Sequence, residues 1–322
     1  MPAKWEEIAA AKCAALAGSI PEEWRIPSDI KPSPEELDVS TFPHQSGWFT
    51  EEELKITDSG ASALLEKLRN GELSSEAVTR AFCKRACAAQ QLTNCLSETL
   101  FDSAIKRAQE LDTQLKETGK TVGSLHGLPI SLKDNFNIVG VDSTIGFTGY
   151  VNDPATYNAT LVDLLHDAGA ILYVKTNVPT AMMIAESVNN TFGRTVNPKN
   201  RAFTSGGSSG GESALISFGG SCLGVGTDIG GSLRIPAACT GLFTVRPSFG
   251  RFPTLRCRSG LAGQEAVNSV NGPIARNLED VILWSKAVVD SKPWMVDPKM
   301  LPIPWRTVEK PTKMKLAVLW ND

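Results

Sequence analysis

Two serines in one glycine-rich segment are the residues best placed to do chemistry. The segment runs from Gly206 to Pro236, and within it Ser208 and Ser232 are each flanked by glycines. A serine hydroxyl becomes a nucleophile when a neighbouring base takes its proton. Glycine allows positive φ and a close approach of the backbone, so several N–H groups can be directed at one oxygen atom. The segment therefore predicts a serine nucleophile beside an oxyanion-binding loop.

Histidine is the usual base for such a serine, but no histidine follows either serine. Residues 206–210 fit the G-x-S-x-G pattern of α/β-hydrolases, in which a histidine comes after the serine. His44, His126 and His166 all precede it. Chain order alone does not exclude a triad, because other folds use other orders. His44, in a proline-rich stretch, and His166, on an expected helix, are interpreted as structural, whereas His126 stays open.

A lysine can replace histidine as the base if burial keeps its amine neutral. Lys133 follows the apolar run Pro129–Leu132 and precedes Asp134, which places it at the end of an expected strand. Side chains at strand ends can converge on a site. Most lysines are solvated surface charges, so the position of Lys133 by itself leaves both interpretations open.

Other kinds of site find little support in the sequence. The glycines are not followed by G-K-[ST] and do not have G-x-G-x-x-G spacing, which argues against a nucleotide site. The histidines are scattered, and no H-x-x-x-H or paired-cysteine spacing suits zinc. We therefore expect no metal and no cofactor.

The bulk composition favours a globular protein with small, neutral partners. The chain has 322 residues, a formal net charge of −3 and 42% hydrophobic residues. It has no dense basic block for nucleic acid and no apolar run of about 18 residues for a membrane, and charged residues interrupt the N-terminal region where a signal peptide would lie. We expect a soluble, cytoplasmic protein that binds neither nucleic acid nor membrane. The seven cysteines are expected to be buried free thiols: Cys13, Cys83, Cys87, Cys95, Cys222, Cys239 and Cys257.

The elements that must position these residues divide near Gly127. Residues 1–50 predict an N-terminal arm, with a short helix over 5–16 and then a loop rich in proline and serine that wraps over the body. Amphipathic spacing and capping residues predict three further helices. They are expected near 61–68, from Ser74/Ser75 to beyond Phe82, and over 101–115.

After Gly127 short apolar runs alternate with helical stretches, which predicts an α/β fold with a mixed sheet and helices on both faces. Strands are expected at 128–132, 170–174 and 223–226, and helices at 161–168 and 277–289. Lys315–Leu319 is expected to form a further buried strand. Such a strand normally leads into more sheet, so we interpret the chain as truncated at its C-terminus. An edge strand that closes a complete domain is the alternative.

The glycine-rich segment resembles the signature of the amidase signature family. G-G-S-S-G-G-E from Gly206 is followed by G-V-G-T-D-I-G-G-S-L-R-I-P up to Pro236, and His126–Asp134 looks like the segment that carries the family's catalytic lysine. Residues 81–85 and 91–98 resemble the fungal acetamidase and general amidase branch. The resemblance implies the amidase signature fold. Residues 51–322 would form the N-terminal and central portion of that domain, whose later part is absent.

The resemblance also implies a role for each residue of the site. Ser232 would be the nucleophile, Ser208 the bridging serine and Lys133 the base of a Ser-Ser-Lys triad. Backbone N–H groups would form the oxyanion hole, those of Ile229, Gly230, Gly231 and Ser232. Asp228 and Arg234 are interpreted as supports of this loop, and a cis peptide bond is implied before Ser208.

Three functions follow as hypotheses. The first is an amidase that hydrolyses small linear or aromatic carboxamides to carboxylate and ammonia through an acyl-enzyme. The second is a catalytically inactive, truncated fragment. The third is an amidotransferase subunit that supplies ammonia to a tRNA-loading partner, but Thr227–Ser232 reads T-D-I-G-G-S, the form of stand-alone amidases. The expected partner is a small amide, and the oligomeric state is open, with a homodimer as one option.

Overall fold

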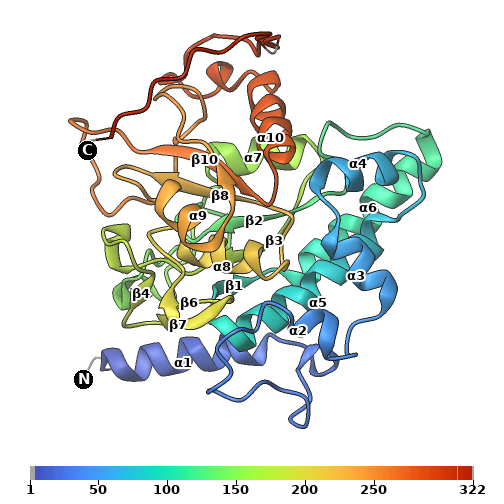
Figure 1. Cartoon of the computed structure of the whole chain (residues 1–322), viewed down its shortest axis with the longest axis vertical. Coiled ribbons are helices and arrows are strands. Elements are labelled where there is room, and N and C mark those ends of the chain that lie inside the picture. The colour runs from blue at the N-terminus through green and yellow to red at the C-terminus, as the bar shows by residue number, and fades with distance from the viewer. Residues whose placement is uncertain (1–3, 310, 321–322) are drawn as a thin grey trace.

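A six-stranded mixed sheet organises the structure, with strand order β1-β3-β2-β8-β10-β9. The computed structural model describes residues 4–309 and 311–320 (Figure 1). The strands of this sheet are β1 (Leu96–Thr99), β2 (Pro129–Lys133), β3 (Ile171–Thr176), β8 (Leu223–Asp228), β9 (Phe243–Thr244) and β10 (Val270–Ala275). Strand β2 is parallel to both β3 and β8, whereas β1, β9 and β10 pair antiparallel with their neighbours. The predicted mixed sheet is confirmed.

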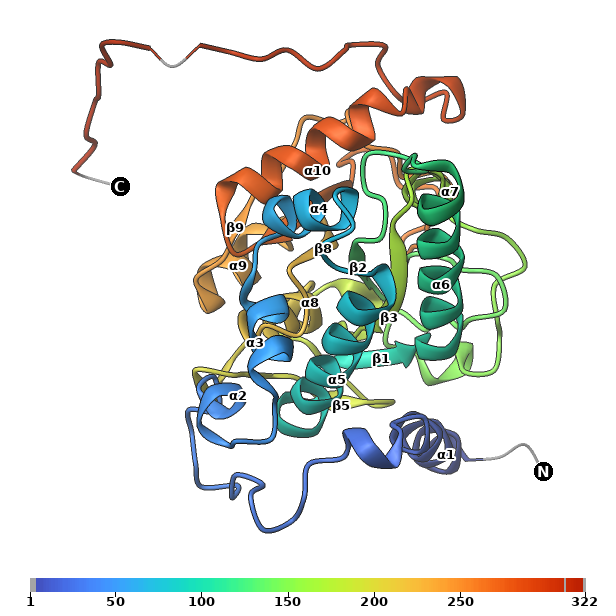
Figure 2. The same cartoon turned by 90° about the vertical axis from the view of Figure 1, so that its right-hand side faces the viewer.

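Ten α-helices are described around this sheet. They are α1 (Trp5–Gly18), α2 (Phe42–Gln45), α3 (Glu51–Asp58), α4 (Ala61–Arg69), α5 (Ser75–Thr93), α6 (Phe101–Thr118), α7 (Thr160–Asp167), α8 (Gly210–Ser217), α9 (Arg234–Thr240) and α10 (Leu278–Asp290). Four short 3₁₀ helices and two short hairpins complete the described elements, the hairpins being β4 (Val188–Asn189) with β5 (Gly193–Arg194), and β6 (Val196–Asn197) with β7 (Asn200–Thr204). Figure 2 shows α4 and α10 side by side at one end of the molecule and α1 at the other.

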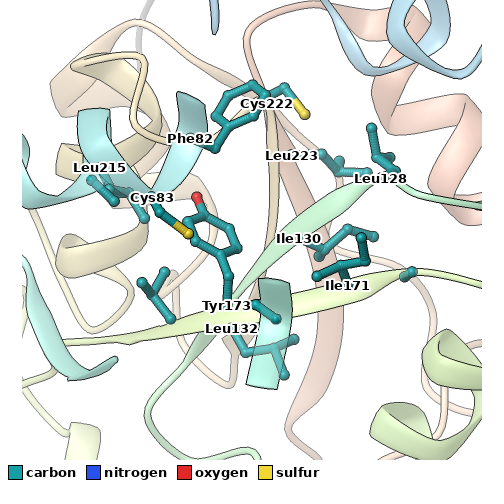
Figure 3. Close-up of a cluster of buried hydrophobic side chains, with 14 of the residues drawn as sticks. Phe82, Cys83, Leu128, Ile130, Leu132, Ile171, Tyr173, Leu215, Cys222 and Leu223 are labelled. Atoms are coloured by element: carbon teal, nitrogen blue, oxygen red, sulfur yellow. The ribbon is translucent and has the colours of Figure 1, made fainter. Parts of the chain in front are cut away.

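Helices cover both faces of the sheet, and two apolar clusters join them to it. A small cluster joins Ile216 of α8 to Leu233 and to Ile274 of β10. The main core instead joins the other side of β8 to Trp284 of α10. In β3, Tyr173 points toward Cys83 of α5 and Leu215 of α8 (Figure 3). The predicted placement of helices on both faces is therefore confirmed.

Local capping signals in the sequence mark several helix ends correctly. Ser74 accepts a hydrogen bond from the Ala77 amide at the start of α5. The turn after α4 contains Gly71, with φ of +71°, and the turn after α7 contains Gly169, with φ of +86°. Glycine adopts this left-handed conformation without steric cost, so the expected ends of α4 and α7 hold.

The expected strand at Lys315–Leu319 is wrong. Residues 315–319 have no strand structure, and their large apolar side chains are exposed: Leu316 by 84%, Val318 by 66% and Leu319 by 80%. A strand needs a neighbour for its backbone hydrogen bonds, and the described part of the chain provides none here. The extended segment lies away from the sheet in Figure 2.

Other differences have local causes. Strand β10 was not expected because it contains Gly272 and Pro273, both unfavourable in strand interiors. The cysteine prediction is wrong for Cys13 and Cys239, which are exposed, while four others are buried and all seven are free. Cys13 lies on the outer helix α1, where its thiol donates to the Thr191 carbonyl at 3.0 Å.

The first 50 residues, where described, pack against the body. Trp24 makes an edge-to-face contact with Phe101 of α6, with ring centroids 5.5 Å apart. The Val39 amide donates to the Pro198 carbonyl at 2.9 Å, and both Val39 and Phe42 belong to the main core. These contacts join the described part of the first 50 residues to α6 and to the segment around Pro198.

One buried carboxylate ties α10 to the start of α4, and we expect its loss to destabilise the fold. Asp280 accepts hydrogen bonds from the Ala61 and Ser62 amides at 2.8 and 2.9 Å. Asp280→Ala leaves these amides unsatisfied and should lower the free energy of unfolding by about 2 kcal/mol, measured by urea denaturation. Glu279→Ala, an exposed change on the same helix turn, is the control. Equal midpoints for both variants would contradict this role.

Candidate active site

Four segments bring the predicted catalytic residues together at one edge of the sheet. Lys133 is the last residue of β2, and Asp228 is the last residue of its parallel neighbour β8. The carboxyl ends of adjacent parallel strands lie at the same sheet edge. Ser208 lies just before α8, which packs on β2 and β8, and Ser232 lies in the turn between β8 and α9.

Glycines in β8 let α8 approach the sheet closely enough to place Ser208. A Cβ atom at Gly226 would lie 2.7 Å from the Ser209 hydroxyl oxygen, and one at Gly224 would collide with the Glu212 carboxylate. Real Cβ contacts are not this short, so larger residues here would push the helix away. The glycine spacing in this strand thus serves close packing between α8 and β8.

Lys133 is fully buried, and within the described residues its amine forms hydrogen bonds to hydroxyl and carbonyl oxygens. Nζ lies 2.7 Å from Ser208 Oγ, 2.6 Å from Thr227 Oγ1 and 3.5 Å from the Thr227 carbonyl oxygen. Burial disfavours the charged amine and lowers the pKa of Lys133 to about 7, although Asp228, Glu212 and Asp134 oppose this shift. A substantial fraction of Lys133 is therefore neutral near pH 7, as a proton acceptor requires.

Backbone geometry fixes Ser208 beside this amine. The Gly207–Ser208 peptide bond is cis. A Cβ atom on Gly207 would lie 2.6 Å from the Glu186 nitrogen and the Ile184 carbonyl oxygen, so only glycine fits there. Ser187 Oγ donates to the Gly206 carbonyl at 3.2 Å and accepts from the Gly210 amide at 3.0 Å. The loop is thus held on both sides of Ser208.

Ser232 opens into a pocket shared with Ser208. The pocket has an empty volume of about 350 Å³, part of it open to solvent, and Thr227 and Ile229 also line it. The Ser209 amide donates to the Ser232 carbonyl at 3.3 Å, which links the two serine loops through their backbones. Within the described residues no hydrogen bond joins the two hydroxyls of Ser208 and Ser232. The structure brings both serines to one pocket without that final contact.

Asp228 organises the loop around Ser232. Its carboxylate accepts from the Gly231 amide at 2.8 Å and the Leu233 amide at 3.1 Å, and it pairs with the guanidinium of Arg234 at 3.0 Å. Burial alone would raise the pKa of Asp228, but the hydrogen bonds from Arg234, Leu233 and Gly231 outweigh it and hold the pKa below its usual value. Arg234 itself is half-exposed. These contacts place Asp228 and Arg234 against the loop that carries Ser232, and their supporting roles stay a prediction.

The four amides expected around the oxyanion are not equivalent. The Gly231 N–H is engaged by Asp228, whereas the N–H groups of Ile229, Gly230 and Ser232 donate to no acceptor in the described part of the chain. Ile229 and Ser232 also line the pocket. Three free donors next to the serine hydroxyl suit an oxygen that develops negative charge.

Sequence reasoning missed three features of the site. Thr227, the nearest neighbour of the Lys133 amine, stands in the quoted motif without a role. Glu212 is a fully buried carboxyl group that accepts from Ser131 at 2.7 Å and Thr176 at 2.9 Å, and burial raises its pKa to about 7. The pocket wall comes from segments distant in sequence, which no motif marks, at Ala181–Met183, Ser259–Leu261 and Ser269.

The histidines lie elsewhere. His126 is buried and accepts from the Val122 amide at 3.0 Å through Nδ1, which makes it a structural residue and removes the ambiguity of the sequence. His44 faces Asp58 and His166 lies on α7, as expected.

Among the described residues no group of histidine, cysteine, aspartate or glutamate side chains suits a metal ion. No described helix is long and apolar enough to span a membrane.

Comparison with known proteins identifies the family. The profile named Amidase matches residues 77–322. The chain belongs to the amidase family. It is 48% identical to an acetamidase of Emericella nidulans and 42% identical to an amidase of Gibberella moniliformis, and these matches cover 96% and 99% of this chain but 56% and 61% of the relatives. The expected family is confirmed.

A solved structure supports the fold as well. The structure of a fatty acid amide hydrolase matches 96% of this chain with a TM-score of 0.92 and 39% identity, and 55% of that structure is covered. A bacterial aryl acylamidase matches with a TM-score of 0.69 and 29% identity. The amidase signature fold expected from the sequence is confirmed, and the chain spans little more than half the length of these relatives.

We expect Asp228 to control the order of the loop around Ser232. Asp228→Ala removes the acceptor of two amides, and hydrogen bonds to charged groups are worth roughly 1.5–3 kcal/mol each. Hydrogen exchange of the Gly231 and Leu233 amides should accelerate by about tenfold or more, while the amides of α10 keep their protection. Asp153→Ala, which removes an exposed ion pair with Arg258, is the matched control. Unchanged exchange in Asp228→Ala would contradict the role.

Proposed function

We propose that this protein hydrolyses small carboxamides to carboxylate and ammonia, with Ser232 as nucleophile, Ser208 as relay and Lys133 as base. One observation carries the proposal: the buried Lys133 amine, whose pKa burial lowers to about 7, lies 2.7 Å from the Ser208 hydroxyl, which shares a pocket with Ser232. Family membership supports the same chemistry.

The proposed reaction begins with proton transfer from Ser232 through Ser208 to Lys133. Neutral Lys133 accepts the Ser208 proton while Ser208 accepts the Ser232 proton, and Ser232 Oγ bonds to the amide carbonyl carbon. The carbonyl electron pair moves onto oxygen, where the N–H groups of Ile229, Gly230 and Ser232 stabilise it. The Gly231 N–H can also stabilise this oxygen only if it gives up its hydrogen bond to Asp228.

The second half of the reaction reverses the proton flow. The carbon–nitrogen bond breaks as Ser208 delivers its proton to the leaving nitrogen and receives one from Lys133. Ammonia departs and leaves an acyl-enzyme on Ser232. Water then attacks the ester carbonyl carbon, and one of its protons passes through Ser208 to Lys133. The bond between that carbon and Ser232 Oγ breaks as Lys133 returns this proton through Ser208 to Ser232, and the carboxylic acid leaves and ionises to carboxylate in solvent.

The pocket supports a small substrate with an apolar acyl group. Met182, Met183 and Leu261 line it beside Ser232, and the 48% identical relative from Emericella nidulans is named an acetamidase. The proposal also includes the organisation and setting of the protein. It keeps residues 1–50 as an N-terminal arm and residues 51–322 as the catalytic domain, together with a cytoplasmic location and a homodimeric assembly.

Two alternatives make different predictions. An inactive chain would hold the same residues without forming an acyl-enzyme. An amidotransferase subunit would release ammonia only with its partner, but the T-D-I-G-G-S sequence of Thr227–Ser232 favours a stand-alone amidase. Both alternatives are outcomes of the tests below.

We expect a fluorophosphonate probe to label Ser232 with a rate that rises with pH through about 7, because Lys133 must lose its proton to act as base. Lys133→Met should slow labelling by about 10²- to 10⁴-fold. Ser232→Ala should abolish it, and peptide mapping identifies the labelled serine. Ser259→Ala, a change in the same pocket wall, is the control. A label on Ser208, or none on any serine, would overturn the assignment.

We expect ammonia release to be fastest with short amides. A panel from acetamide through benzamide to long-chain amides, assayed with the chain alone, measures this directly. A preference for long-chain amides would contradict the small acyl pocket. Ammonia release that requires a copurified partner would favour the amidotransferase subunit.

A further inference from the structure

A group of buried charges behind Lys133 links the active site to the N-terminal helix. Asp134, which follows Lys133, is fully buried, and its carboxylate accepts from Ser97 Oγ at 2.7 Å, the Ile145 amide at 2.6 Å and Thr144 Oγ1 at 3.2 Å. Because Asp134 is adjacent to Lys133, these donors fix the end of β2 from which the Lys133 side chain extends. The position of the base therefore depends on two segments, Ser97–Glu98 and Asp142–Ile145.

Lys175 holds the second of these segments. It is fully buried on β3, and its amine donates to the Asp142 carbonyl and to Ser143 Oγ, the latter at 2.7 Å. The same amine lies 4.0 Å from Asp134 Oδ1. Lys175 thus contacts the residue after the base and the loop that anchors it.

Lys12 of α1 holds both segments at once. Its amine pairs with Glu98 Oε1 at 2.5 Å and with Asp142 Oδ2 at 2.8 Å, and its side chain is only 13% exposed. Burial opposes the charge on Lys12, but the hydrogen bonds to Asp142 and Glu98 outweigh it and raise the pKa of Lys12. Glu98, the next residue after Ser97, is half-buried, and Lys12 is the cation in direct contact with its carboxylate, while Lys175 acts on it from further away. A poorly solvated carboxylate without such a contact is costly.

We infer that Lys12 is a positioning residue for the proposed reaction. From the N-terminal arm it holds Glu98 and Asp142, whose segments supply the hydrogen-bond donors of Asp134. In this way it sets the orientation of the Lys133 side chain. The inference rests on the proposed function. It extends that function to a helix that precedes the family match at residues 77–322. A small displacement of a catalytic group lowers the reaction rate by a large factor, so the loss of a distant positioning contact can lower the rate as well.

The electrostatics give the inference a second signature. The Lys133 amine is faced by Asp228 at the end of β8, Glu212 of α8 and Asp134, while Lys175 is faced by Asp134, Glu98, Asp142 and Lys12. Burial raises the pKa of Glu98 to about 7 even beside Lys12, so Glu98 takes up a proton more readily once the Lys12 charge is removed. The excess of negative charge in this group then comes from Asp142 and the ionised fraction of Glu98. That excess favours the protonated form of Lys133, so the pKa of Lys133 should rise. The pH at which the labelling of Ser232 reaches half its maximum rate should then move to a higher value.

The test compares variants by fluorophosphonate labelling of Ser232 against pH, with rates expressed per folded molecule after active-site titration. Lys12→Met should lower the plateau rate by about tenfold and move the midpoint to higher pH. Lys12→Arg keeps the charge and should retain most of the rate. Lys4→Met, which removes an exposed cation next to the start of α1, should match the wild-type protein.

The double variant Lys12→Met with Glu98→Gln keeps the inference testable if Lys12→Met folds poorly, because it removes the carboxylate that Lys12 compensates. Its midpoint should return toward the wild-type value. A Lys12→Met variant with the wild-type rate and midpoint would overturn the inference, as would an equal loss in Lys4→Met. If the wild-type protein itself shows no labelling of Ser232, the proposed function fails instead.

Discussion

The burial of the Lys133 amine among hydroxyl groups is the constraint on which the rest of the site depends. An amine buried against a carboxylate keeps its proton, since the opposite charge stabilises it. Here the contacts within hydrogen-bond range are Ser208 and Thr227, while the neighbouring acids Asp228, Glu212 and Asp134 are engaged by other donors. Desolvation therefore dominates, and the amine can accept a proton near neutral pH.

This arrangement requires a sheet with two different faces. In β8, Leu223 and Val225 belong to the main core, and Gly224 and Gly226 alternate with them on the side against which α8 packs closely. Close packing excludes water from the space around Lys133 and also sets the position of Ser208. The same glycines thus serve desolvation and geometry together.

Several carboxylates with little exposure to solvent have close donors or cations as partners. Asp228 binds two amides and Arg234, Asp280 binds the start of α4, and Glu98 with Asp142 binds Lys12. Asp280, Glu98 and Asp142 join segments that are distant in sequence, whereas Asp228 binds donors three to six residues ahead in its own loop. In both cases a buried carboxylate needs several donors. The fold and the site are consequently stabilised by the same kind of contact.

The sequence by itself determined the elements with strong local signals and the family of the protein. Amphipathic spacing together with Gly71, Ser74 and Gly169 marked α4, α5 and α7, because helix formation and helix ends depend on neighbouring residues. The motif with Ser208, Ser232 and Lys133 indicated the family. Only the tertiary structure decided which long-range partners each segment has. It left Lys315–Leu319 without a neighbouring strand, brought Thr227 to the Lys133 amine, engaged the Gly231 amide with Asp228 and placed Lys12 of the arm against Glu98. Pairing, burial and hydrogen bonding between distant segments depend on how the chain packs in space, and no spacing along the chain encodes them.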